Sequence, residues 1–287
     1  MKLVVGYLAT PGGADAVSLG VQLARTLGAE LELRLVLAPD DVTTPRVTSD
    51  KFHEVLAEQS SEWLEEALQL VPDDVTAHGA VLVDDSVAGA LSEEAVRLDA
   101  EAIVVGGSGG GLIGSLSLGS LVDDLLHFAP VPVAVAPRGT RNSDVERIRT
   151  VTCAIGDRPG AARLLDTAVR ASKATGAPLR LVSLVAVDEH GEAGGAAARE
   201  HAYATLESAK AALPEGSDVT AVVADGATVE EAVEGLDWED GDLLMLGSSR
   251  LAPPRRLFIG STAARILRHL QVPMVVTPGD EESTRAT

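Results

Sequence analysis

The second half of the chain repeats the order of apolar and glycine-rich segments found in the first half. Leu31 aligns with Leu179 at an offset of 148 residues, and Gly106 aligns with Gly247 at an offset of 141. Further pairs at the second offset are Gly119 with Gly260, Pro132 with Pro273 and Pro137 with Pro278. The chain must therefore build the same unit twice, and 287 residues suffice for two domains of ordinary size.

Each repeat alternates short apolar runs with longer amphipathic segments. In the first repeat, the pattern predicts strands over residues 2–7, 31–37, 75–83, 102–105 and 131–136. It predicts helices over residues 14–27, 52–70 and 86–98, and a fourth helix that follows Gly119. Strands and helices that alternate at these lengths form parallel βαβ units, so the sequence predicts an α/β fold of two tandem doubly wound domains.

The polar segment from Pro137 to Asp144 has no hydrophobic periodicity and separates the two repeats. We expect domain 1 over residues 1–137, a linker over 138–147 and domain 2 over 148–279. The remaining residues, 280–287, are polar and form a frayed tail in this interpretation.

The charge of the chain is strongly acidic, with 43 Asp and Glu against 23 Lys and Arg and a net charge of −20. Proteins that bind the phosphate backbone of nucleic acids are basic, so nucleic-acid binding is not expected, and neither is binding to an anionic membrane. The one cysteine, Cys153, lies in an apolar strand pattern and excludes an intramolecular disulfide. No apolar run approaches the ~20 residues that span a bilayer, so we expect a cytoplasmic protein.

A glycine-rich stretch, residues 106–120, lies between a predicted strand and a predicted helix and contains seven glycines and four serines. Backbone N–H groups in such a loop, and at the start of the helix, can bind an anion. We therefore interpret this stretch as a phosphate-binding loop. The alternative is a connection without a ligand, although seven glycines lose much conformational entropy on folding.

The motif Gly106-x-x-Gly109, nine residues, and then Gly119-Ser120 is followed by a helix and by the segment Ala129-Pro130-Val131-Pro132-Val133. This arrangement resembles the universal stress protein family, whose ATP-binding members carry Gly-x-x-Gly, nine residues and Gly-Ser/Thr after the fourth strand. The resemblance covers nearly the whole chain as two such domains.

The resemblance implies a five-stranded parallel sheet of order 3-2-1-4-5 in each domain, with helices on both faces. It also implies that nucleotide lies at the carboxyl ends of the first and fourth strands, where the strand order reverses. Fifth strands pair across a dimer in this family, and a tandem chain can make that pairing internally, between Val131–Ala136 and Met274–Thr277. A homodimer of the tandem chain stays open as an alternative.

The ligand that the resemblance implies is ATP or a related adenine nucleotide, with or without Mg²⁺. The residues expected at the phosphates are Gly106, Gly107, Ser108, Gly109, Gly110, Gly111, Gly119 and Ser120. Leu8, Ala9 and Val36 are expected to border the adenine. ATP-binding members usually carry an aspartate after the first strand, whereas this chain has Leu8 there and Gly156 at the equivalent position of the second repeat.

The second repeat carries a degenerate form of the glycine motif, with Gly247, Arg250, Gly260 and Ser261 at the matching positions. Arg250 replaces the second glycine. Its guanidinium can pair with a phosphate, or it can fill the space that a phosphate needs. Arg250 forms a basic cluster with Arg255 and Arg256. This cluster either makes salt bridges with its own or the partner domain, or binds phosphate or an acidic partner.

The sequence favours nucleotide binding for regulation or sensing over catalysis. The P-loop motif is missing, the six histidines lack metal-ligand spacing, and the serines of the glycine-rich stretch have no nearby histidine base. We therefore expect no metal site and little or no rapid turnover. Two alternatives stay open: a nucleotide-free scaffold that acts through protein contacts, and a slow ATPase or phosphotransferase.

Overall fold

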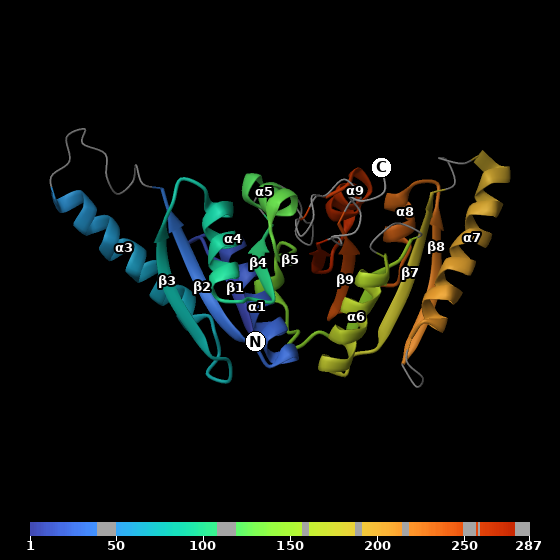
Figure 1. Cartoon of the computed structure of the whole chain (residues 1–287). Coiled ribbons are helices and arrows are strands. Elements are labelled where there is room, and N and C mark those ends of the chain that lie inside the picture. The colour runs from blue at the N-terminus through green and yellow to red at the C-terminus, as the bar shows by residue number, and fades with distance from the viewer. Residues whose placement is uncertain are drawn as a thin grey trace.

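The computed structural model describes residues 1–38, 50–107, 119–156, 161–186, 191–213, 218–248, 257 and 259–278. For residues 50–57 and 191–194 it describes the backbone alone. Figure 1 shows two α/β halves side by side, with α3 and α7 at the outer ends of the molecule.

The first half contains β1 (Lys2–Gly6), α1 (Pro11–Leu27), β2 (Glu30–Leu37), α3 (Asp50–Gln69), β3 (Ala77–Val83), α4 (Val87–Arg97), β4 (Ala102–Gly106), α5 (Ser120–Phe128) and β5 (Val133–Ala136). A 3₁₀ turn, η1 (Thr140–Asn142), follows. The second half contains β6 (Thr150–Ala154), α6 (Ala161–Thr175), β7 (Leu179–Ala186), α7 (Gly191–Ala211), β8 (Val219–Gly226), α8 (Val229–Glu234), β9 (Asp242–Gly247), α9 (Ser261–His269) and β10 (Met274–Thr277).

The strands form one continuous sheet of ten strands in the order β3-β2-β1-β4-β5-β10-β9-β6-β7-β8. Within each half the order is 3-2-1-4-5, as the family resemblance implied, and the pairing is parallel, as the alternation of strands and helices predicted. The halves join through β5 and β10, which pair antiparallel with Ala134 opposite Val275. The expected pairing of the two fifth strands is therefore present within one chain.

Among the described residues, two large hydrophobic cores cover the faces of this sheet and continue across the β5–β10 junction, and a small third cluster lies between β7, β8 and α8. One core packs α1, α3, α6 and α7 against the sheet and includes Ala134 and Val275. The other packs α4, α5, α8 and α9 and includes Val133 and Met274. All four residues of β5 are buried, which is typical of a strand with helices on both faces.

Helix α1 begins three residues earlier than its apolar periodicity indicated. Thr10 caps it by accepting a hydrogen bond from the Gly13 N–H (3.3 Å), and Pro11 occupies the first helical position. Proline suits that position because its missing N–H has no partner in the first turn. At the other end, Gly28 takes a left-handed conformation with φ 67°, as a glycine after a helix commonly does.

The segment between the halves is folded against α1. The carboxylate of Asp15 is buried and accepts hydrogen bonds from the N–H groups of Gly139 (3.1 Å) and Arg141 (2.9 Å). It also forms an ion pair with the Arg141 guanidinium at 2.9 Å. The sequence predicted a plain linker here, because nothing in the local pattern indicates that Asp15, 126 residues earlier, binds it.

Candidate functional site

The candidate site lies at the carboxyl ends of β1 and β4. These strands are neighbours in parallel register, with Val5 opposite Val104, so Gly6 and Gly106 end at the same edge of the sheet. The strand order reverses here, because the chain leaves β1 for β2 on one side and enters β4 on the other. Open α/β sheets generally bind ligands at such a point.

The first turn of α1 packs backbone against backbone on the end of β4. A Cβ atom at Gly106 would lie 1.9 Å from the carbonyl oxygen of Gly12. A Cβ atom at Gly13 would lie 1.9 Å from the carbonyl oxygen of Leu8. The packing of α1 therefore explains why residues 13 and 106 are glycines, independently of any ligand.

The N–H group of Gly107 is already used. It donates to the carbonyl oxygen of Ala136 at 3.0 Å, which extends the β4–β5 ladder by one bond. Ser248 makes the same bond in the second half, to Thr277 at 2.8 Å. Gly107 was expected to present its N–H to phosphate, and in this conformation it cannot do so with that group.

Helix α5 opens at the site without a side-chain cap. Its N-cap is Gly119, with φ −83° and ψ 166°, and Ser120 is its first residue. Helices α1, α4 and α8 are instead capped by the hydroxyls of Thr10, Ser86 and Thr228. The first N–H groups of a helix have no partner within the helix, so the start of α5 offers donors and a partial positive charge to an anion.

Helix α9 opens in the same way in the second half. Gly260 is its N-cap, again without a side-chain cap, and Ser261 is its first residue. Gly247, at the end of β9, is exposed, and a Cβ atom there would make ordinary contact with Leu164 at 3.6 Å. The close backbone contact that requires a glycine at residue 106 is therefore absent at Gly247.

The expected adenine side of the first site is only partly open. Leu8 is 43% exposed and Ala9 is exposed, so both border the site edge. Val36, near the end of β2, is buried in the core beneath α4 and α5 and presents little surface to a ligand. Ser108, Gly109, Gly110, Gly111 and Arg250 lie outside the described residues, and their roles stay predictions.

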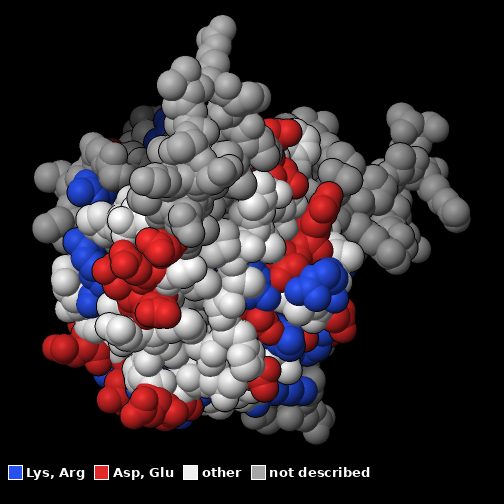
Figure 2. All heavy atoms as spheres, turned by 90° about the vertical axis from the view of Figure 1, so that its left-hand side faces the viewer, with Lys and Arg blue, Asp and Glu red and all other residues white. Residues whose placement is uncertain are grey.

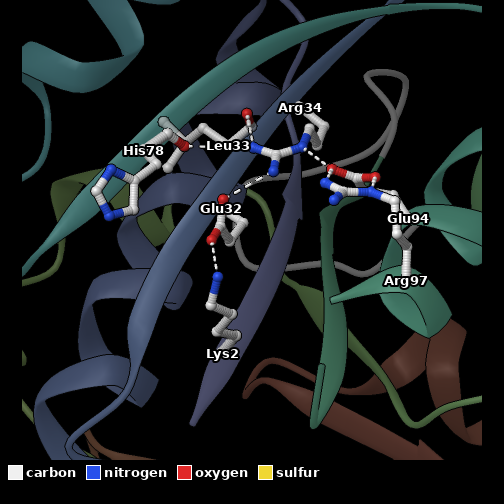
Figure 3. A network of polar contacts seen from close by, with 7 residues as sticks. All are labelled: Lys2, Glu32, Leu33, Arg34, His78, Glu94 and Arg97. Carbon is white, nitrogen blue, oxygen red and sulfur yellow. Dashed lines mark hydrogen bonds and ion pairs between the residues drawn. The ribbon is translucent and has the colours of Figure 1, made fainter. Parts of the chain in front are cut away.

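A charged network that the sequence did not reveal lies in the interior next to this site (Figure 3). Arg34 on β2 pairs with Glu32 at 2.7 Å and with Glu94 of α4 at 2.5 Å. Its guanidinium also donates to the backbone carbonyls of Leu33 and His78. Arg34 is opposite Gly6, where a Cβ atom would lie 2.8 Å from a terminal methyl group of Leu91 and would require that side chain to shift.

The carboxylates of this network stay ionised to low pH. The hydrogen bond from Arg97, with the bond and charge of Arg34, overcomes the effect of burial and lowers the pKa of Glu94 to about 2. Burial acts to raise the pKa of Glu32, but hydrogen bonds from Lys2 and Arg34 outweigh it, so this pKa is lowered. Because every charge here has a partner, the network serves to join β1, β2 and α4.

The counterpart of Glu32 in the second half is Arg180, at the offset of 148. Arg180 forms an ion pair with Asp242 at 3.0 Å and donates to the hydroxyl of Thr152 at 2.9 Å. Its guanidinium also stacks 4.9 Å from the ring centre of Trp238. The two halves thus share a backbone fold but differ in their interior polar contacts.

Within the part of the chain that the structure describes, surface charge and the remaining candidate groups indicate no second reactive site. Figure 2 shows clusters of acidic side chains on the end of the molecule where α3 and β3 lie, and exposed acids of α3 such as Glu62 and Glu65 contribute to this charge. Cys153 is buried, and its pKa is raised by burial, as expected for a thiol that packs as an apolar group. Among the described residues, no helix combines the length and apolar character required to cross a membrane.

Comparisons with known proteins agree with this geometry. The sequence profile described as "Universal stress protein family" matches residues 1–137 and 147–278. A universal stress protein of Mycobacterium tuberculosis (strain ATCC 25618 / H37Rv) is 29% identical over 97% of this chain and 100% of that protein.

Solved structures share the tandem fold. A universal stress protein from Archaeoglobus fulgidus DSM 4304 superimposes with a TM-score of 0.69 at 20% identity, over 98% of this chain and 97% of the other. A functionally unknown protein from Pseudomonas aeruginosa PAO1 gives 0.58 at 15% identity, over 98% and 93%. Because the family profile matches both halves of the sequence, this chain belongs to the universal stress protein family.

Proposed function

We propose that domain 1, residues 1–137, binds ATP or a related adenine nucleotide at the carboxyl ends of β1 and β4, with or without Mg²⁺. Binding would regulate the role of the protein in a stress response. Membership of the family supports the stress-related role, and the glycine motif of residues 106–120 supports the nucleotide. Domain 2, residues 148–279, is the degenerate partner in this proposal.

The observation that carries the proposal is the uncapped start of α5. Gly119, near the end of the glycine-rich stretch, leaves the first N–H groups of the helix without a side-chain acceptor. A phosphate bound there would complete the hydrogen bonding of the helix start and would interact favourably with its dipole. Because Gly106 packs against Gly12 and the N–H of Gly107 is engaged, this proposal assigns the phosphate donors to residues from 108 onward and to Ser120.

The test is isothermal titration of the full chain with ATP, with and without Mg²⁺, using the matched variants Gly119→Val and Gly260→Val. Both glycines have extended backbone angles that valine also adopts, so neither change strains the backbone. We expect Gly119→Val to weaken binding at least about tenfold, because a side chain blocks the approach of phosphate to the helix start. Gly260→Val should leave binding nearly unchanged.

Two results would contradict the proposal. One is the absence of binding at millimolar ATP in the wild-type protein. The other is equal loss of affinity in both variants, which would assign the effect to helix stability rather than to a site in domain 1.

A second candidate is a nucleotide-free scaffold that acts through protein contacts. The observation in its favour is the exposed Leu8, which stands where ATP-binding members usually carry an aspartate near the adenosine. Mass spectrometry of the protein as purified separates the two candidates, since a nucleotide carried through purification would exclude a scaffold without nucleotide. A slow ATPase would release phosphate in the wild type and not in Gly119→Val.

A further inference from the structure

A cavity of about 530 Å³ lies between the two halves, on the sheet face that carries α1 and α6. Its floor consists of strands from both halves, including Leu3 of β1, Ala134 of β5 and Met245 of β9. Its walls are the last turns of α1 and one face of α6. The volume falls within the range of small-molecule sites, which occur preferentially where domains meet.

The floor of this cavity is apolar, and the hydroxyls of Thr26 on the α1 wall and of Thr277 on β10 are already engaged. Thr26 donates to the carbonyl oxygen of Gln22 and accepts from the Ile148 N–H at 2.9 Å. Thr277 donates to the carbonyl oxygen of Leu246 at 3.3 Å. A ligand on this floor therefore finds methyl and methylene groups, which favour a hydrocarbon chain.

The wall formed by α6 combines small side chains with two cations. Five residues of α6 line the cavity and share one helical face, because they follow one another at intervals of four, three, one and three residues. They are Arg163, Thr167, Arg170, Ala171 and Ala174. Arg170 makes a long contact with Asp166 at 3.4 Å, and both side chains are largely exposed. The acidic lining residues, Asp99 and Glu101, belong to the turn between α4 and β4, in the other half of the chain.

We propose that this cavity binds an amphipathic monocarboxylate, such as a medium-chain fatty acid. The hydrocarbon chain would lie on the strands, and the carboxylate would meet Arg163 and Arg170 at the α6 wall. Asp99 and Glu101 would repel a second carboxylate at the domain 1 wall, so dicarboxylates of equal length are excluded. This site is separate from the glycine-rich stretch and is independent of nucleotide binding.

The experiment is calorimetric titration of the full chain with dodecanoate and dodecanedioate, each below any micelle concentration, and with dodecanol below its solubility limit. We expect dodecanoate to bind more tightly than the other two. Ala171→Trp places an indole in the cavity and should weaken dodecanoate binding at least about tenfold. The double variant Arg163→Glu/Arg170→Glu should weaken it about fivefold and leave dodecanol within about twofold.

Lys173→Glu is the matched charge control, because Lys173 is exposed on α6 and does not line the cavity. It should stay within about twofold of the wild type. If Ala171→Trp unfolds the protein, Ala174→Trp at an exposed position tests the same wall. The inference is overturned if dodecanoate does not bind, if folded tryptophan variants bind it like the wild type, or if dodecanol or dodecanedioate binds equally well.

Discussion

At the scale of single residues, the interior pairing of Arg34 with Glu94 links β2 to α4. The Glu94 side chain is 7% exposed. When Glu94 loses its negative charge, the buried guanidinium of Arg34 keeps Glu32 as its one ionic partner. We expect Glu94→Gln to lower the free energy of unfolding at neutral pH by roughly 2 to 3 kcal/mol. Urea unfolding measures this, with Arg97→Ala as the control: Arg97 is 64% exposed, so its loss should cost less than about 1 kcal/mol.

The same pair predicts a pH dependence. The pKa of Glu94 falls from an ordinary 4.5 to about 2 in the folded protein, so its ionised form stabilises the fold above pH 4.5. That stabilisation is lost as the pH falls from 4.5 towards 2, because the unfolded chain takes up the proton first. The stability difference between wild type and Glu94→Gln should therefore shrink across this window. A difference that stayed constant down to pH 2 would contradict the assignment.

Gly106 and its counterpart Gly247 allow the packing role of the glycine to be tested separately from nucleotide binding. Alanine at residue 106 would place its Cβ 1.9 Å from the Gly12 carbonyl oxygen, and the backbone cannot yield cheaply there. We expect Gly106→Ala to cost about 2 to 3 kcal/mol of stability, and Gly247→Ala, with its nearest contact at 3.6 Å, less than about 0.5 kcal/mol. Thermal unfolding of both variants checks this, and equal costs would refute the packing explanation.

At the scale of elements, the sequence predicted what depends on local pattern. The alternation of strands and helices followed from periodicity, and the order of strands followed from the family resemblance. The start of α1 was placed late, because Thr10-Pro11 carries the cap while the apolar pattern begins only at Ala14. At this helix, the capping threonine and the proline that follows it mark the first residue better than hydrophobic spacing does.

Contacts between distant segments could not be predicted in this way. Glu32, Arg34 and Glu94 look like ordinary surface residues in the sequence, and only the pairing of β2 with α4 makes them interior. The role of Gly106 likewise depends on α1 meeting the end of β4. The glycine pattern located the candidate site, but it did not distinguish glycines that pack from glycines that bind.

The segment between the halves offers a test of one such distant contact. Asp15→Ala removes the acceptor for two backbone N–H groups and for the Arg141 guanidinium, so residues 139–141 should detach from α1. We expect a loss of about 1 to 3 kcal/mol and faster tryptic cleavage after Arg141, followed by mass spectrometry. Asp144→Ala, at an exposed position of the same segment, is the control and should be cleaved at the wild-type rate.

At the scale of the whole molecule, each half completes the other. Besides the β5–β10 pairing, Leu257 donates its N–H to Ala129 (3.0 Å) and Ile259 donates to Leu126 (2.9 Å), so the residues before α9 are bound to the end of α5. Both side chains are buried in the core that α5 and α9 share. These contacts join the segment before α9 to the end of α5 and add to the β5–β10 pairing that holds the two halves together.

The β5–β10 register also predicts what domain 1 does alone. Val135, Ala134 and Val133 lie opposite Met274, Val275 and Val276, which are the counterparts of Val133, Ala134 and Val135 at the offset of 141. The register is thus self-complementary, with Ala134 at the centre, so β5 can pair with a second copy of itself across a two-fold axis.

A fragment of residues 1–142 should form a homodimer, because it exposes an apolar strand that is fully buried in the whole chain. Light scattering after size exclusion measures its mass. Ala134→Lys should give a folded monomer, and a wild-type fragment that is monomeric at micromolar concentration would show that the second half contributes more than a repeated strand.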